Sequence, residues 1–186
     1  YNRAKRPGMH EMGSLQQVAH GADSGLYFQL HQTLGASEMF HGAVIANHRG
    51  SNTRAFKDVQ KVGQDLQSLQ AAHGTTRTAA KVAIVFDYDN MWGLDDARNY
   101  ANETKKYWRT IQEHYQYFWK HDIPVEIIAT TDDLTAYDLV IDPMHFMMSA
   151  QFATKLKAYV QQGGHLIGTY ITGVVDHDFL AYHGDG

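Results

Sequence analysis

The sequence predicts an α/β protein in two parts, and three observations support this prediction. Apolar residues make up 44% and charged residues 19% of the 186 residues, as in ordinary globular proteins. From about residue 81, short β-branched runs alternate with helical periodicity, which is typical of an open, mostly parallel sheet with helices on its faces. Before residue 73 the order is instead helix, apolar strand, long loop and helix.

A polar segment from His73 to Thr78 separates two periodic stretches of the chain. Small and polar residues between periodic segments are typical of a linker. We therefore expect a first domain over residues 1–76 and a second domain over residues 77–186.

The first domain is expected to begin with a helix and a buried strand. Pro7-Gly8 is a turn signal, and apolar residues then recur at helical spacing over residues 12–19, up to Gly21. Residues 25–30 form a compact apolar segment rich in aromatic residues, which is typical of a buried strand in a barrel.

A long loop and a second helix complete the first domain. Residues 31–50 show neither the helical nor the strand period, so they predict a loop. Apolar residues then repeat every three or four positions from Phe56 to Leu69, which predicts a helix, and Ser51 or Asn52 is placed to cap it.

The second domain is expected to alternate strands and helices. A strand at Lys81–Phe86 leads into a polar loop at 87–93, and a long helix follows from about Asp95. Ser149 is placed to cap a later helix that ends at Gly163-Gly164. Further strands are expected at residues 125–129, 138–141 and 165–170.

Charge and composition exclude several classes of partner. The net charge of −4 and the lack of a basic cluster give no reason to expect nucleic acid or an anionic membrane surface. The apolar runs are shorter than the roughly 20 residues of a membrane helix, and the lack of cysteine rules out disulfides and thiolate metal sites in this chain. We expect a soluble, cytoplasmic protein whose natural N-terminus precedes Tyr1.

No cofactor or metal ion is expected. The loop at 87–93 contains two carboxylates and one glycine, whereas a nucleotide site needs a glycine-rich turn around the phosphates. The acidic pair could hold magnesium, but solvated loop carboxylates are commoner. The twelve histidines include no His-Glu-x-x-His pattern, so we interpret most of them as surface or packed residues.

The long loop carries the most informative polar residues. Glu38 and His41 would share one face if they form a helical turn, and Phe28 and Phe40 are nearby in the sequence. A carboxylate and an imidazole beside an aromatic ring can bind the hydroxyls and the C–H face of a sugar. The alternative is that both are ordinary polar loop residues.

Several motifs, in the same order, resemble family 42 glycoside hydrolases, which are β-galactosidases. In the first half they are Lys5-Arg6-Pro7-Gly8, Gln17-Val18-Ala19-His20-Gly21-Ala22-Asp23, Tyr27-Phe28-Gln29 and Glu38-Met39-Phe40-His41-Gly42-Ala43. In the second half they are Phe86-Asp87-Tyr88-Asp89-Asn90-Met91-Trp92, Ile123-Pro124-Val125, Tyr137-Asp138-Leu139-Val140 and Gly163-Gly164. The resemblance implies the end of a catalytic (β/α)8 barrel followed by the domain that assembles a homotrimer.

The resemblance also implies an activity, hydrolysis of terminal β-galactosides with retention. That reaction needs two carboxyl groups about 5 Å apart, and by the family's motifs both precede Tyr1, so no catalytic residue is expected in this chain. By motif position, Phe28, Glu38 and His41 are expected to bind the galactose. Leu30 and His31 stand where the family usually has Trp and Arg, which puts the substrate preference in doubt.

The second domain is similar in fold to flavodoxin-like proteins and class I glutamine amidotransferases, but it has no cysteine nucleophile. We therefore expect it to be non-catalytic. Its helix around residues 107–119 has aromatic residues on more than one face, which suggests burial against the sheet and a second surface. The alternative function for the whole chain is a non-catalytic oligomerisation or interaction module of flavodoxin-like fold, and a flavodoxin-like nucleotide binder is a third, less favoured interpretation.

Overall fold

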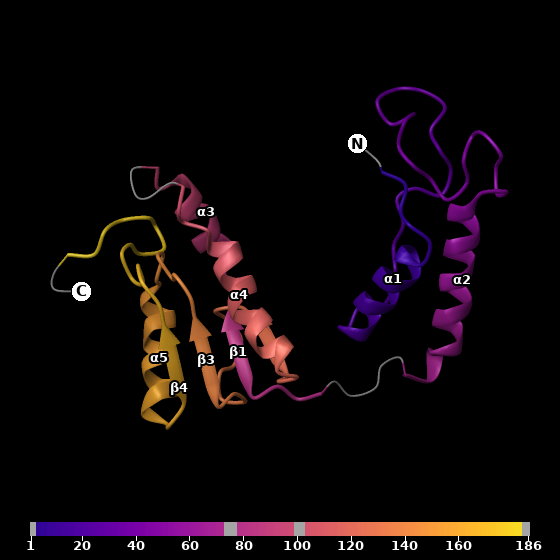
Figure 1. The fold of residues 1–186 in the computed structure, drawn as a ribbon. Helices are drawn as coiled ribbons and strands as arrows, with labels where there is room; N and C mark the ends of the chain where they lie inside the picture. Colours follow the sequence, from indigo (N-terminus) through magenta and orange to yellow (C-terminus); the bar gives the residue numbers. More distant parts are fainter. Residues whose placement is uncertain (1–2, 73–77, 99–102, 184–186) are drawn as a thin grey trace. The chain divides into compact units, whose positions relative to one another are not determined.

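The chain forms two compact units, residues 1–77 and 78–186. A computed structural model describes residues 3–72, 78–98 and 103–183 (Figure 1). The domain boundary expected between residues 76 and 77 falls at the edge of residues 73–77, which lie outside the described part. None of the helices in the described ranges is both long and apolar enough to cross a membrane.

Two packed helices form the first unit. α1 (Met9–Ala19) starts after Gly8, whose φ of 79° is a left-handed conformation that glycine adopts at little cost. α2 (Arg54–Ser68) packs against α1 around Val62, and a short 3-10 turn, η1 (Gln70–Ala72), follows it. The Lys61 ammonium lies 2.9 Å from the carboxylate of Glu11 and so links the two helices at their surface. Both predicted helices are confirmed.

The cap of α2 differs from the prediction, which named Ser51 or Asn52. The structure uses Thr53, whose hydroxyl oxygen accepts a hydrogen bond from the Phe56 N–H at 3.1 Å. Thr53 has the extended backbone that an N-cap needs, whereas the N–H of Asn52 donates to the carbonyl of Arg49 in a preceding turn. The composition of the segment did not distinguish three adjacent polar residues.

The strand predicted at residues 25–30 is not formed, and that prediction was wrong for this structure. Leu26, Phe28 and Leu30 are exposed. Among the described residues, the carbonyls of Gln29 and Leu30 accept backbone hydrogen bonds from Val44 and Ile45 of the following loop and from no other residue. A strand requires a neighbour along its length to form a ladder, and the described part of this unit offers residues 25–30 no such neighbour.

The second unit contains a four-stranded, wholly parallel sheet. β1 (Val82–Val85) and β3 (Leu139–Asp142) are its central strands, and β2 (Val125–Ile128) and β4 (His165–Gly168) its edges, in the order β2-β1-β3-β4. Val82 lies opposite Val125 on one side and Leu139 on the other. The predicted parallel sheet is confirmed, and its β1 is fully buried, as its β-branched run indicated.

Helices cover both faces of this sheet (Figure 1). On one face, Val82 and Ile84 pack with residues of α3 (Tyr88–Asp96) and α4 (Tyr107–Lys120). On the other face, Ala83 and Val85 pack with α5 (Ala150–Gln161). Alternate residues of one strand therefore supply two cores, which is the arrangement of an α/β sheet.

The segment after β1 is a helix, although a loop over 87–93 and a long helix from Asp95 were predicted. Asp87 caps α3, because its carboxylate accepts from the Asp89 N–H at 2.8 Å and the Asn90 N–H at 3.4 Å. The Lys105 ammonium donates to the carbonyls of Leu94 and Ala97, where α3 ends. An ammonium at a helix C-terminus is favourable and stabilises the end of α3. The structure therefore has two helices, α3 and α4, where one long helix was predicted.

The later elements agree with the prediction. The Ser149 hydroxyl caps α5 by accepting from the Phe152 N–H at 3.1 Å, and Gly163, with φ of 98°, turns the chain towards β4. In α4, Tyr107 and Phe118 are buried against the sheet, whereas Trp108, Tyr117 and Trp119 are exposed. These three rings therefore lie outside the core that α4 forms with the sheet.

Candidate functional site

The loop at residues 31–50 folds back along the segment that precedes it. The N–H groups of Val44 and Ile45 donate to the carbonyls of Gln29 and Leu30 at 2.9 and 2.7 Å. The Gln32 side chain then braces the loop from within: its Nε2 donates to the Met39 carbonyl at 2.9 Å and its Oε1 accepts from the Asn47 N–H at 3.0 Å. These bonds fix where the Glu38–His41 turn lies relative to Phe28.

Glu38 and His41 belong to one hydrogen-bonded turn. The His41 N–H donates to the Glu38 carbonyl at 2.9 Å, and the Met39 N–H donates to the Ala36 carbonyl at 3.3 Å. The Glu38 side chain is half-buried and that of His41 is exposed. In the described part of the chain the Glu38 carboxylate has no hydrogen-bond or ion-pair partner, so both of its oxygens are free to accept from a ligand.

Phe28 contacts the imidazole of His41. Their ring centroids are 6.1 Å apart and their planes meet at 70°, an edge-to-face contact. The Phe28 side chain is 71% exposed, so its ring remains available to a ligand. The structure thus brings Phe28 together with His41 and places Glu38 one turn from them, whereas Phe40 is exposed and has no ring contact with another described residue.

Gln29 next to Phe28 has an unusual amide. Its Oε1 accepts from the Thr33 hydroxyl at 3.1 Å, while its Nε2 is buried without an acceptor among the described residues. Buried polar atoms nearly always have a partner. The sequence places Gln29 in a motif but does not mark it as a site residue, because an orphaned amide of this kind is visible only in three dimensions.

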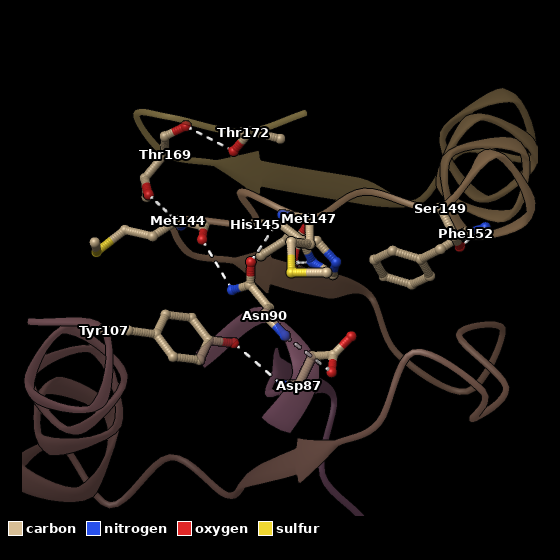
Figure 2. A network of polar contacts seen from close by, with 11 residues as sticks. Asp87, Asn90, Tyr107, Met144, His145, Met147, Ser149, Phe152, Thr169 and Thr172 are labelled. Atoms are coloured by element: carbon tan, nitrogen blue, oxygen red, sulfur yellow. Dashed lines mark hydrogen bonds and ion pairs between the residues drawn. The ribbon is translucent and has the colours of Figure 1, made fainter. Parts of the chain in front are cut away.

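A second polar cluster, which no sequence pattern predicted, lies at the carboxyl end of the parallel sheet (Figure 2). Asn90 is fully buried: its Nδ2 donates to the Met144 carbonyl at 3.0 Å and its Oδ1 accepts from the Met147 N–H at 2.9 Å. These bonds tie the start of α3 to the segment after β3. The Tyr107 hydroxyl accepts from the Asp87 N–H at 3.1 Å, and burial raises the pKa of Tyr107 to about 12.

Asp142 and His145 form a buried pair, and the His145 side chain lies near Asn90 (Figure 2). Asp142 Oδ1 and His145 Nδ1 are 2.7 Å apart, and the imidazole stacks on Phe152 of α5 with centroids 4.9 Å apart. Asp142 Oδ2 has no hydrogen-bond partner among the described residues. Three or more metal-binding side chains nowhere come together in the described ranges. The network joins the segments that follow the central strands β1 and β3 at the carboxyl end of the sheet.

Two family models match the chain along most of its length. Residues 1–69 match the model described as "Beta-galactosidase", and residues 80–186 match the model described as "Beta-galactosidase trimerisation domain". The chain belongs to glycoside hydrolase family 42. The resemblance stated from the motifs is therefore confirmed.

Curated family 42 relatives align with nearly the whole chain but are much longer. The chain is 47% identical over 184 residues to β-galactosidase GalA of Bacillus licheniformis and 45% identical over 183 residues to β-galactosidase GanA of Bacillus subtilis. It is covered to 99% and 98% in these alignments, and it spans 27% of each relative.

Solved family 42 structures share the fold. The catalytic mutant of Gan42B, a β-galactosidase from G. stearothermophilus, matches with a TM-score of 0.92 and 45% identity over 99% of the chain. The β-galactosidase of Rahnella sp. R3 matches with a TM-score of 0.90 and 40% identity over the whole chain. The chain covers 27% of each of these proteins. These matches confirm the fold class, and the roles of Phe28, Glu38 and His41 stay predictions.

Proposed function

We propose that this chain is part of a retaining β-galactosidase that hydrolyses terminal, non-reducing β-D-galactose residues. The observation that carries the proposal is the loop geometry, with the exposed Phe28 ring against His41 and the unpaired Glu38 carboxylate one turn away. Membership of family 42 supports it, because the matched relatives are β-galactosidases.

Each of the three side chains has a different task in this proposal. The Glu38 carboxylate accepts hydrogen bonds from two galactose hydroxyls, and a bond to a charged group contributes about 1.5–3 kcal/mol. The His41 ring nitrogen makes a further hydroxyl contact, and the Phe28 ring packs against the apolar C–H face of the sugar. Together they hold the galactose and do not take part in bond cleavage.

Cleavage itself is assigned to a pair of carboxyl groups that precede Tyr1 in the complete enzyme. One protonates the departing oxygen and the other attacks the anomeric carbon. The chain spans 27% of its curated relatives, which leaves ample length for that pair. The proposal needs no metal ion and no cofactor.

Replacement of Glu38 tests the proposal directly. In the full-length protein, Glu38→Gln should lower kcat/KM for a nitrophenyl β-galactoside by about 10- to 100-fold, which corresponds to the loss of one charge-assisted hydrogen bond. Glu113→Gln is the matched control, because Glu113 is an exposed glutamate of α4 that pairs with Arg109 across one helical turn. Equal kinetics for the two variants would contradict the role of Glu38.

We further propose that residues 78–186 assemble the enzyme into a homotrimer in the cytoplasm. The match of this unit to a trimerisation domain supports self-association. Its sheet is covered by helices on both faces, so the assembly surface lies on the outside of those helices or at a sheet edge. Light scattering from the full-length protein should give three times the mass of one full-length subunit, and a monomer at micromolar concentration would contradict the proposal.

A further inference from the structure

Gln29 lies next to Phe28 and binds both ends of the loop at residues 31–50. Near the start of the loop, the Thr33 hydroxyl donates a hydrogen bond to Gln29 Oε1 at 3.1 Å. Near its end, the Val44 N–H donates to the main-chain carbonyl of Gln29 at 2.9 Å. One residue beside the Phe28 ring therefore holds both ends of the loop that carries Glu38.

Further hydrogen bonds extend from Thr33 to the Glu38–His41 turn. Asn47 Nδ2 donates to the Thr33 carbonyl at 3.1 Å, and the Asn47 N–H donates to Gln32 Oε1 at 3.0 Å. Gln32 Nε2 in turn donates to the Met39 carbonyl at 2.9 Å. A series of hydrogen bonds thus runs from the start of the loop to the backbone of that turn.

The Gln29 amide is not placed to contact a sugar itself. Its Nε2 is buried and has no acceptor among the described residues, and its Oε1 is taken by Thr33. The neighbouring Phe28 ring, in contrast, is exposed. A ligand on that ring cannot reach a nitrogen that protein atoms already cover, so Gln29 can affect a ligand only through the residues that it holds.

The position of the loop matters because the proposed galactose site combines residues from its two sides. Phe28 precedes the loop, whereas Glu38 and His41 lie within it, and the Phe28 and His41 rings touch edge to face. Binding groups contribute fully only when surrounding contacts fix their places before the ligand arrives. A loop of this length needs such contacts, and the bonds of Gln29 supply them at its base.

We propose that Gln29 is a positioning residue for galactose binding, which holds the Glu38–His41 turn against Phe28 through Thr33 and Val44. The inference rests on the proposed function, because it concerns the same galactose site. Gln29 takes no part in bond cleavage. Loss of its contacts should therefore weaken sugar binding more than it slows the cleavage step.

Substitutions of Thr33 test the inference with little disturbance of the loop. In the full-length protein, Thr33→Val removes the hydroxyl that Gln29 binds, whereas Thr33→Ser keeps it. Thr33→Val should raise KM for a nitrophenyl β-galactoside about 3- to 10-fold, as for the loss of one neutral hydrogen bond, with kcat within about twofold of wild type. The inhibition constant of free galactose, which measures binding without cleavage, should rise by the same factor. Thr33→Ser should bind galactose as wild type does.

Gln29→Met removes the other partner of the same bond. Combined with Thr33→Val, it should weaken galactose binding no more than Gln29→Met does alone, because the two residues act as a unit. Gln64→Met is the matched control, since Gln64 is an exposed glutamine of α2, and its galactose inhibition constant should equal that of wild type. Thermal unfolding of each variant checks that its fold is retained.

Three results would overturn the inference: an unchanged galactose inhibition constant in both Thr33→Val and Gln29→Met, equal losses in Thr33→Val and Thr33→Ser, or a double variant whose loss is the product of the single losses. If Gln29→Met unfolds, the comparison of Thr33→Val with Thr33→Ser decides. The proposed function fails separately. A wild type that leaves the nitrophenyl galactoside intact refutes the hydrolase, whereas an active wild type that is impaired by Glu38→Gln but not by Thr33→Val or Gln29→Met refutes only the role of Gln29.

Discussion

Replacement of Asn90 by alanine should destabilise the second unit strongly. The Asn90 side chain bridges α3 and the backbone after β3 with two hydrogen bonds, one to the Met144 carbonyl and one from the Met147 N–H. The substitution leaves a buried carbonyl and a buried N–H without partners. Each orphaned group costs about 1–3 kcal/mol, so the free energy of unfolding should fall by about 2–5 kcal/mol. A domain of this size has about 5–15 kcal/mol in total.

Hydrogen exchange is the most direct assay for this prediction. The Met147 N–H, which Asn90 protects, should exchange faster by at least about tenfold, because each 1.4 kcal/mol of lost opening free energy gives that factor. Amides of α1 and α2 in the first unit should exchange at unchanged rates and serve as the internal control. Unchanged exchange at Met147 would refute the reasoning.

Asn90→Asp separates lost hydrogen bonds from lost volume. The new carboxylate still accepts from Met147 but faces the Met144 carbonyl as a second acceptor. Burial next to that carbonyl oxygen should raise the pKa of the new carboxyl in the folded state above the ordinary value of about 3.9. The variant should therefore be closest to wild type below that pH and lose stability as the pH rises through the raised pKa. A constant stability difference from wild type between pH 4 and 8 would contradict this account.

Two further predictions concern packing in the second unit. His145→Leu leaves Asp142 buried with neither oxygen paired and should lower the free energy of unfolding by about 3–5 kcal/mol. Replacing both residues with leucine should cost less, and chemical denaturation can measure this double-mutant cycle. If the double variant loses as much stability as the two single variants together, the two residues do not act as a pair. Gly164→Ala should destabilise by about 1–3 kcal/mol, because a Cβ would lie 2.3 Å from the Tyr159 ring, which its hydroxyl holds against the Tyr137 carbonyl. In α2, a Cβ added at Gly63 would have no atom within 4 Å, so Gly63→Ala should raise the melting temperature and the free energy of unfolding by about 0.5–1 kcal/mol. An increase in stability for Gly164→Ala as well would refute the packing argument.

The sheet could be predicted from the sequence because its strands and caps have strong local signals. Val82–Val85 is a β-branched run because both of its faces are buried, and Ser149 precedes an apolar helical period directly. Asp87 was missed as a cap because its polar neighbours give the composition of a loop. The prediction of a strand at residues 25–30 failed for a different reason. A strand needs neighbouring strands, and a local sequence pattern does not show whether they are present.

The candidate site was predictable in part. The resemblance in motifs grouped Phe28 with Glu38 and His41, but the contact between the Phe28 and His41 rings is visible only in the structure. The spacing of Glu38 and His41 allowed them to share a turn, and the structure forms that turn. Asn90 and its partners Met144 and Met147 are 54 and 57 residues apart in the chain. No local sequence pattern links positions so far apart, so this network could be identified only from the three-dimensional structure.

The central claim is that Phe28, Glu38 and His41 hold a galactose unit, and a crystal structure of the full-length protein with galactose bound tests it most directly. The account predicts the Glu38 carboxylate and a His41 nitrogen within about 3.2 Å of sugar hydroxyls, with the Phe28 ring against the C–H face. Galactose bound elsewhere, or bound with the Glu38 and His41 side chains turned away from it, would contradict the account.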